Sequence, residues 1–563
     1  MNEIVKIIFG LIGGLAMFLF GMNAMSDALQ KAAGERMRQV LSALTRNPVM
    51  GVLAGALVTA VLQSSSATTV MVIGFVSADL MGLPQAISVI FGANIGTTMT
   101  AQLLAFRLSD YIYPILFIGF LLNFAAKDPK VKNVGMVLFS FGLLFEGIEI
   151  MGSVMKPLAS SPVFTGLMAR VTDIPVLGVL LGMVMTLVVQ SSSATIAVLQ
   201  NFAQQAGPDG VTSIMGLAGA IPILLGDNIG TTITALLASI GQSKNAKRTA
   251  VAHSVFNITG SIVMLFLIPW FAQFITFISP KGAEVEVISR QIANAHTAFN
   301  LLNTLVWLPL LPLMVKIVKA IIPGEDAPLT LSDSQPRFLN RDVLNQPVAA
   351  LYLAAQEIAR CAGEVREMLT RTDRIFQEPD RAPAEEDSLR VMGAAVEDLH
   401  DKIADYISAL FAGGGLTEDQ AEETAGLMVV SDQIARIAQR CVEVLDCACK
   451  DGRALSLSDV AQEELHRCFT TAQDLFDRAV RAVREGDPRL AEAILRDKEL
   501  LKKAERALSK RHLERVKAQT CDPSLTVAFS NILYALDRIG DSCGAVAEEV
   551  LDGTSLPVLP AET

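Results

Sequence analysis

The chain has 563 residues, 51% of them hydrophobic, and a formal net charge of −11. This length and apolarity exclude a single soluble domain, and the acidity leaves no basic stripe with which to bind nucleic acid. Residues 1–320 contain 31 charged side chains, whereas residues 321–563 contain 72. A membrane domain followed by a water-soluble domain is therefore predicted.

Apolar stretches of unequal length dominate the first 320 residues. Each is long enough to cross or enter a bilayer whose hydrocarbon core is about 30 Å thick. They run near 5–26, 48–78, 84–106, 111–126, 133–152, 174–203, 213–240, 250–279 and 298–322. Many are interrupted by Gly, Ser, Pro or Asn, which is typical of broken or re-entrant helices. We expect an all-α polytopic transport domain over residues 1–322.

The sequence changes character after this domain. Residues 323–345 are polar and punctuated by proline, which indicates a linker. From residue 346 to 555, apolar side chains repeat at steps of three and four, the period of amphipathic helices. We predict two antiparallel helical bundles, about 346–450 and 455–553. All seven cysteines lie in this half, which favours a reducing compartment. The Lys316–Lys319 cluster directly before it favours a soluble half on the cytoplasmic side of the cytoplasmic membrane.

Two polar motifs occur twice within the membrane half. The sequence QSSSAT at Gln63–Thr68 recurs 127 residues later at Gln190–Thr195. The sequence GANIGTT at Gly92–Thr98 recurs 134 residues later as GDNIGTT at Gly226–Thr232. Because both motifs recur in the same order, we predict an internal duplication with repeats at about 5–152 and 174–322.

The residue types of these motifs suit the binding of small ions inside a membrane. Their amide and hydroxyl groups are costly to leave unpaired in hydrocarbon, and a run of three serines weakens a helix. At a helix break, hydroxyls and N-terminal amides can surround an anion such as phosphate, and oxygen atoms can replace the water shell of sodium. Close packing of helices through small residues is the alternative, and the duplication argues against it.

The doubled motifs resemble those of the type II sodium/phosphate cotransporter family, over about residues 5–320. The resemblance implies two repeats of inverted topology and a composite site for phosphate and sodium where the repeats meet. The runs Gln63–Ser66 and Gln190–Ser193 would contact both ions, and the GxNIGTT motifs would shape the cation sites. The implied binding residues are Gln63, Ser64, Ser65, Ser66, Thr68, Asn94, Thr97, Thr98, Gln190, Ser191, Ser192, Ser193, Thr195, Asn228, Thr231 and Thr232.

Three ionisable residues of the membrane half need separate interpretation. Asp227 stands where the first repeat has Ala93, and an ionisable group at membrane depth is a functional candidate by default. We weigh a sodium ligand against a hydrated carboxylate at one mouth of the domain. His253 and His296 lie in a further pair of similar sequences, AHSVFN and AHTAFN. For them a helix-packing role with a bond to a carbonyl is favoured over proton coupling or anion contact.

The soluble half resembles PhoU-like helical domains, most clearly in the sequence Leu536–Asp541. Asp537 and Asp541 are four residues apart and share a helix face, as ligands of a divalent metal would. The counterpart at 432–436 has arginine in place of the second acid. A solvated acid pair is therefore favoured over a metal site. The resemblance implies a regulatory role that senses phosphate status, with a phosphate-signalling protein as a partner.

Enzymatic function has no support in the motifs. The sequence has no Walker motif, zinc-ligand spacing or nucleophile elbow, so transport would be driven by an ion gradient. We predict a sodium-coupled secondary active transporter of inorganic phosphate. Two alternatives stay open: a membrane-anchored phosphate sensor that signals through its helical domain, and a cotransporter of another oxyanion. Proton instead of sodium coupling, and import or export, also stay open.

Overall fold

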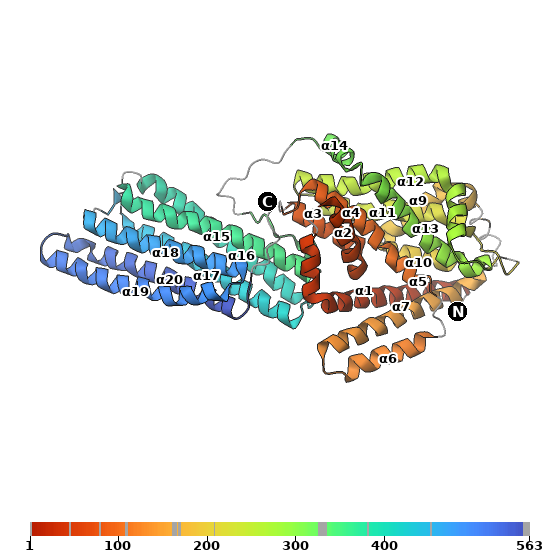
Figure 1. Ribbon diagram of the computed structural model, residues 1–563, viewed down its shortest axis with the longest axis horizontal. Coiled ribbons are helices and arrows are strands. Elements are labelled where there is room, and N and C mark those ends of the chain that lie inside the picture. Colours follow the sequence, from red (N-terminus) through yellow and green to blue (C-terminus); the bar gives the residue numbers. More distant parts are fainter. Residues whose placement is uncertain are drawn as a thin grey trace. The chain divides into compact units, whose positions relative to one another are not determined.

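The computed structural model is helical and divides into two compact units between residues 326 and 327 (Figure 1). It describes residues 3–43, 47–77, 80–106, 111–159, 166, 170–207, 209–324, 335–379, 382–450, 453–455 and 457–555. Residues 325–334 of the predicted linker therefore lie outside the described part. The predicted all-α fold class is confirmed, since the named strands in the described ranges are β1 (Cys449–Lys450) and β2 (Arg453–Ala454), a short antiparallel pair.

The first unit consists of helices of very different lengths, as the uneven apolar stretches predicted. Those described are α1 (Glu3–Ala43), α2 (Pro48–Leu62), α3 (Ser65–Ser77), α4 (Leu83–Gly96), α5 (Thr98–Leu104), α6 (Ile112–Ala125), α7 (Pro129–Ala159), α9 (Pro175–Val189), α10 (Ser192–Ala203), α11 (Gly216–Ala238), α12 (Lys244–Ile278), α13 (Glu284–Trp307) and α14 (Leu311–Ile321).

Within the described residues, five helical stretches are long and apolar enough to cross a membrane. They lie in α1, in α4 with α5, in α7, in α11 and in α12, and a sixth is added if α13 and α14, bent by 86°, form one span. Large apolar side chains such as Phe124 on α6 and Phe266 on α12 are exposed. Lipid accepts such a surface, whereas water does not. The first unit is therefore a membrane domain, as predicted.

Two of the predicted apolar stretches are broken in the middle. The stretch near 48–78 forms α2 and α3, and the stretch near 174–203 forms α9 and α10. The breaks fall at Gln63 and Gln190, whose φ angles of 53° and 56° are left-handed. A non-glycine residue rarely takes this conformation, and it ends the preceding helix.

The serine after each break starts the next helix. Ser64 Oγ accepts a hydrogen bond from the amide of Ala67, and Ser191 Oγ accepts one from the amide of Ala194, both at 3.2 Å. A hydroxyl in this position satisfies an amide that the first helical turn leaves without a partner. The QSSSAT sequence thus encodes a helix end and a helix start side by side.

The first glycine of each GxNIGTT motif holds a neighbouring helix close to the broken one. An added Cβ at Gly92 on α4 would lie 2.0 Å from the carbonyl oxygen of Val52 on α2. An added Cβ at Gly226 on α11 would lie 2.0 Å from that of Val179 on α9. Such distances are far inside van der Waals contact, so both positions require glycine. The two motifs of each repeat are therefore packed against each other.

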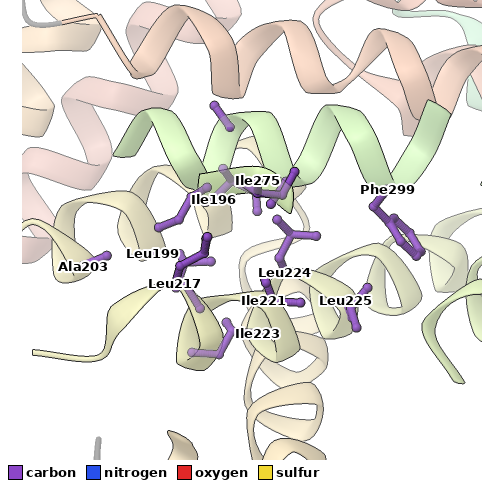
Figure 2. Close-up of a cluster of buried hydrophobic side chains, with 14 of the residues drawn as sticks. Ile196, Leu199, Ala203, Leu217, Ile221, Ile223, Leu224, Leu225, Ile275 and Phe299 are labelled. Atoms are coloured by element: carbon purple, nitrogen blue, oxygen red, sulfur yellow. The ribbon is translucent and has the colours of Figure 1, made fainter. Parts of the chain in front are cut away.

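An apolar core holds the second broken helix in place. Figure 2 shows side chains from α10, α11, α12 and α13 that gather between these helices, including Ile196, Leu224, Ile275 and Phe299. Each of these four side chains is at most 1% exposed. Because α10 is fixed between α11 and α13, its polar residues have defined neighbours on both helices.

The second unit is a helical array that begins at the end of the linker. Its described elements are the 3-10 turn η2 (Arg341–Val343), α15 (Pro347–Gln377), α16 (Ala382–Ala412), α17 (Glu418–Ala448), α18 (Asp459–Glu485), α19 (Pro488–Lys517), the 3-10 turn η4 (Pro523–Leu525) and α20 (Thr526–Leu551). The fully buried carboxylate of Glu357 on α15 accepts hydrogen bonds from the amides of Arg337 and Phe338 at 2.8 and 2.6 Å, and it pairs with Arg360.

The six long helices of this unit fall into two groups of three with the bounds of the two predicted bundles, and the two groups pack against each other. Helices α15 to α17 form one group and α18 to α20 the other, with α17 packed along α20 and α15 along α18. Apolar side chains such as Phe469, Phe476 and Phe529 are buried within the single array that results. The spacing of apolar residues correctly predicts amphipathic helices, but it does not predict which neighbouring helix covers each apolar face.

Candidate functional site

Each helix break is crossed by a pair of threonine hydroxyls. Thr59 Oγ1 donates to Thr68 Oγ1 at 2.8 Å, and Thr186 Oγ1 lies 3.1 Å from Thr195 Oγ1. All four residues are buried. Thr59 and Thr186 were missed at the sequence level, although they precede the two glutamines by the same four residues and repeat at the same offset of 127.

The two break glutamines make equivalent bonds but differ in exposure. Gln63 Oε1 accepts from Thr100 Oγ1 at 2.8 Å, and Gln190 Oε1 accepts from Thr234 Oγ1 at 3.5 Å. Gln63 is only 6% exposed, whereas Gln190 is exposed. Helix α1 lies against the first break, where Ser26 Oγ donates to the carbonyl of Leu62 at 2.7 Å. The first break is therefore covered and the second is open.

The serines line the first turns of α3 and α10. Ser65 and Ser193 are buried, at 4% and 7% exposure, whereas Ser64, Ser66, Ser191 and Ser192 are half-buried. The first amides of a helix have no partner within the helix, and they attract anions. Among the described residues, no hydrogen bond connects one QSSSAT sequence with the other. The structure thus gives two similar polar breaks, and their union in one composite site stays a prediction.

Each motif asparagine contacts one of the two histidines. Asn94 Oδ1 lies 3.3 Å from His253 Nε2 on α12, and Asn228 Oδ1 lies 3.1 Å from His296 Nε2 on α13. All four side chains are buried. The partner of each of these ring nitrogens is thus the amide carbonyl oxygen of a motif asparagine. The AHSVFN sequence thus contacts the first GxNIGTT motif, and the AHTAFN sequence contacts the second. Below, these two groups of contacting residues are together called the polar centre.

Other polar atoms of this centre have no partner among the described residues. Asn257 and Asn300, the last residues of the histidine sequences, donate through Nδ2 to the carbonyls of His253 and His296 at 3.1 and 3.0 Å. The side-chain oxygens of both asparagines are buried without a hydrogen-bond partner. Buried polar atoms normally have partners, so these two oxygens, like Nδ1 of His253 and of His296, are groups that an additional partner would have to satisfy.

Asp227 is a fully buried carboxyl group within α11. Its Oδ1 accepts a hydrogen bond from Thr186 Oγ1 at 2.6 Å, and its Oδ2 has no partner among the described residues. A carboxyl group so placed is costly when charged, unless a cation or a proton accompanies it. At 0% exposure it is not a hydrated carboxylate at the mouth of the domain. That alternative of the sequence interpretation is therefore wrong.

The motif threonines are buried and donate mainly to backbone carbonyls. Thr98 Oγ1 bonds the carbonyl of Ile95 at 2.7 Å, and Thr232 Oγ1 bonds that of Ile229 at 2.8 Å. Thr231 Oγ1 bonds the carbonyl of Asp227 at 2.9 Å. Because the hydroxyl hydrogens are used in this way, the oxygen lone pairs remain available to a cation. Thr97 lies at the junction of α4 and α5.

The two repeats interlock in the first unit. Helix α3 of the first repeat packs against α11 of the second, and α10 of the second packs against α5 of the first. Across one such contact, Thr297 Oγ1 on α13 donates to Thr98 Oγ1 at 3.1 Å. Each polar break is thus bordered by helices of the other repeat, which is the arrangement that a shared binding centre requires.

The acid pair of the second unit lies on α20 as predicted. Burial, followed by the like charge of Asp541, raises the pKa of Asp537, and Asp541 is paired with Arg538 at 2.9 Å. In the described parts of the chain, no group of three or more His, Cys, Asp or Glu side chains is arranged to hold a metal ion. Among the described residues, the acid pair therefore has no third ligand for the divalent metal that was weighed against a solvated pair.

The fold and the duplicated polar centre define a helical membrane protein with internally repeated ion-binding elements. The chain belongs to the Na+/Pi-cotransporter family, whose model matches residues 17–153 and again residues 146–302. The double match supports the internal duplication. A PhoU domain model matches residues 465–550. Phosphate transport is the activity of this family, and its members are transporters, not enzymes.

Relatives cover different parts of the chain. "Putative inorganic phosphate export protein YjbB" of Escherichia coli K12 is 25% identical over 96% of this chain and 97% of its own length. "Uncharacterized protein YqeW" of Bacillus subtilis is 34% identical over 47% of this chain and 84% of its own. Human "Sodium-dependent phosphate transport protein 2B" is 38% identical over 97 residues, 17% of this chain and 14% of its own. No solved structure matches the chain.

Proposed function

We propose that the protein is a sodium-coupled secondary active transporter of inorganic phosphate in the cytoplasmic membrane, with a cytoplasmic PhoU-like domain that regulates it. The observation that carries this proposal is the pair of matched helix breaks at Gln63 and Gln190, each with the same threonine, glutamine and serine contacts. Broken helices of two repeats that interlock are a common basis of ion-coupled transport.

Phosphate would be held by the helix starts and their hydroxyls. Helices α3 and α10 begin at Ser65 and Ser192, so each presents first-turn amides at its break. Several neutral donors can bind an anion without a full counter-charge, because the amide dipoles of the helix favour negative charge at its N-terminus. The half-buried Ser64, Ser66 and Ser191 add hydroxyl donors at the same positions.

Sodium would be held by three of the buried oxygens that have no hydrogen-bond partner among the described residues. These atoms are Asp227 Oδ2, Asn257 Oδ1 and Asn300 Oδ1. Carboxylate and amide oxygens suit a hard cation, and Asp227 supplies a negative charge that a bound cation would offset. The sodium-dependent transport named for the human relative supports this choice.

The unequal exposure of the two breaks fits an alternating-access cycle. Equivalent breaks would be exposed in turn to the two sides of the membrane, and here Gln190 is exposed while Gln63 is covered by α1. Inverted topology of the repeats, which the family resemblance implies, would make this asymmetry the signature of one state of the cycle.

Regulation would act through the contact between the linker and α12. Arg248, in the second turn of α12, donates to the carbonyl of Ile322 at 3.0 Å and to that of Gly324. The same helix contains His253, which contacts Asn94 of the first motif. A change in the linker would therefore reach the polar centre through one rigid helix, and a phosphate-signalling partner of the PhoU-like domain could act by this route.

The direct test is radiolabelled phosphate flux in proteoliposomes that contain the purified full-length protein. We expect accumulation above equilibrium when sodium is higher outside, and none when choline replaces sodium. Phosphate binding without flux would favour the sensor, and flux driven only by a pH gradient would replace sodium by protons. Loading the vesicles with phosphate tests transport in the opposite direction. This test is needed because YjbB, whose match covers 96% of this chain, is named as an export protein.

A further inference from the structure

The membrane domain contains a positively charged side chain, Arg290, away from the two helix breaks. Arg290 is half-buried on α13, between the buried Ser289 and Gln291. Its Nη1 donates to the carbonyl and to Oε1 of Gln102 on α5, at 3.3 and 2.8 Å, and its guanidinium stacks 4.4 Å above the ring of Phe106. No carboxylate among the described residues pairs with it. An unpaired cation on a membrane helix is a functional candidate by default.

The contacts of Arg290 lead to the first GxNIGTT motif. Gln102 Nε2 donates to Thr297 Oγ1 at 2.9 Å, and Thr297 Oγ1 donates to Thr98 Oγ1 at 3.1 Å. Arg290 is therefore connected to a motif residue through two neutral side chains. None of these neutral groups offsets its charge, so the guanidinium keeps its attraction for an anion.

A second, independent feature is a side chain of α10 that bonds the residues directly before Gln102 and Arg290. Gln200 on α10 is 3% exposed, and its Nε2 donates to the carbonyls of Ala101 and Ser289, both at 3.1 Å. Since both partners are acceptors, the amide nitrogen must face them. Gln200 Oε1 is then a buried acceptor without a partner among the described residues. Such an atom requires a donor.

We propose that Arg290 and Gln200 form a docking position for phosphate where α5, α10 and α13 meet, distinct from the two helix breaks. This inference rests on the proposed function. Arg290 would hold two oxygens of the anion through its free edge, as guanidinium groups do with oxyanions. Gln200 Oε1 would accept the proton that phosphate carries at neutral pH and sulfate lacks. Gln102 positions Arg290. Gln200 lies eight residues along α10 from the start of that helix at Ser192, which is about 12 Å, so the docking position is separate from the second break.

A purely structural role for Arg290 predicts different behaviour. In that case it would only cap the end of α5 and cover Phe106, so its loss would lower stability without changing which anion is bound. The docking role predicts a loss of phosphate affinity and a change in the preference for phosphate over sulfate. Anion selectivity is therefore the measurement that separates the two roles.

The experiment measures radiolabelled phosphate binding to the purified full-length protein in detergent with sodium present, with unlabelled sulfate and arsenate as competitors. For Arg290→Gln we expect phosphate binding about 10- to 100-fold weaker, as for the loss of charge-assisted hydrogen bonds. Arg290→Lys should recover part of this loss. Gln200→Leu should weaken phosphate and arsenate while leaving sulfate unchanged. Lys281→Gln, which removes an exposed cation near the start of α13, is the matched control and should bind phosphate like wild type.

Each outcome decides the proposal. Phosphate affinity and selectivity equal to wild type in Arg290→Gln would overturn it. If that variant is not recovered folded, Arg290→Lys decides, because lysine cannot bond Gln102 and hold two anion oxygens together, and unchanged affinity would overturn it. If the wild-type protein binds phosphate without transporting it, the proposed function is refuted. The binding measurements on the Arg290 and Gln200 variants then decide whether the docking position exists. A wild-type protein that binds no phosphate at millimolar concentration refutes both.

Discussion

Replacing Asp227 by asparagine should change both the sodium dependence and the charge balance of transport. The carboxyl group is 0% exposed, is held by Thr186 at 2.6 Å, and has no cationic partner among the described residues. It therefore needs an accompanying cation when it is charged. Asparagine keeps the shape and one oxygen but removes the charge, so the site loses its main attraction for that cation.

Two magnitudes follow from this loss of charge. A neutral oxygen in place of a carboxylate weakens an ionic contact by about 1.5 kcal/mol, so half-saturation should require about tenfold more sodium. If one fewer cation then moves with each phosphate, a potential of 100 mV contributes about 2.3 kcal/mol less to accumulation. The accumulation ratio of Asp227→Asn at that potential should therefore fall by about 50-fold relative to wild type.

The assay is phosphate uptake into proteoliposomes at a series of sodium concentrations, with the membrane potential set by a potassium gradient and valinomycin. Thr186→Val is the control, because it removes the hydrogen bond but keeps the carboxyl group, and it should keep the voltage dependence of wild type. Sodium affinity and voltage dependence unchanged in Asp227→Asn would refute the reasoning. A pH gradient that drives wild-type uptake without sodium would assign the carboxyl group to a proton.

Three further predictions follow from named contacts. Ser65→Ala and Ser192→Ala should each raise the KM for phosphate uptake about 5- to 150-fold, since a lost hydrogen bond at a desolvated site costs about 1–3 kcal/mol, and unchanged uptake in both would refute the site. Glu357→Gln should weaken the hold on the linker by about 2 kcal/mol, seen as about 30-fold faster hydrogen exchange of its amides. Burial raises the pKa of Cys441 to about 12, so iodoacetamide at pH 8 should label the half-buried Cys521 and spare Cys441 in the native protein.

The membrane fold and the positions of its breaks were predictable because their signals are local. A run of serines competes with helical hydrogen bonds, and it recurs in both repeats, so the interruption at Gln63 and Gln190 could be read from residue type and spacing alone. The glycines of the GxNIGTT motifs were part of the same signal. Their role, close contact of α4 with α2 and of α11 with α9, needs the positions of both helices.

The partners of the polar residues were not predictable in the same way. His253 meets Asn94 across 159 residues, and Arg290 meets Gln102 across 188 residues. Nothing in the sequence near either residue specifies these distances, because tertiary packing brings the helices together. The second unit shows the same limit, since its amphipathic period predicted helices and left open which apolar faces would meet.

The differences between the repeats carry as much functional information as their likeness. Thr59 and Thr186 occupy equivalent places, yet Thr59 faces no acid where Thr186 donates to Asp227, because the first repeat has Ala93 at that position. A symmetric pair of sites would bind the same ions twice. One negative charge in only one repeat instead makes the two halves bind cations unequally, and this inequality is what would couple a net charge movement to each turnover.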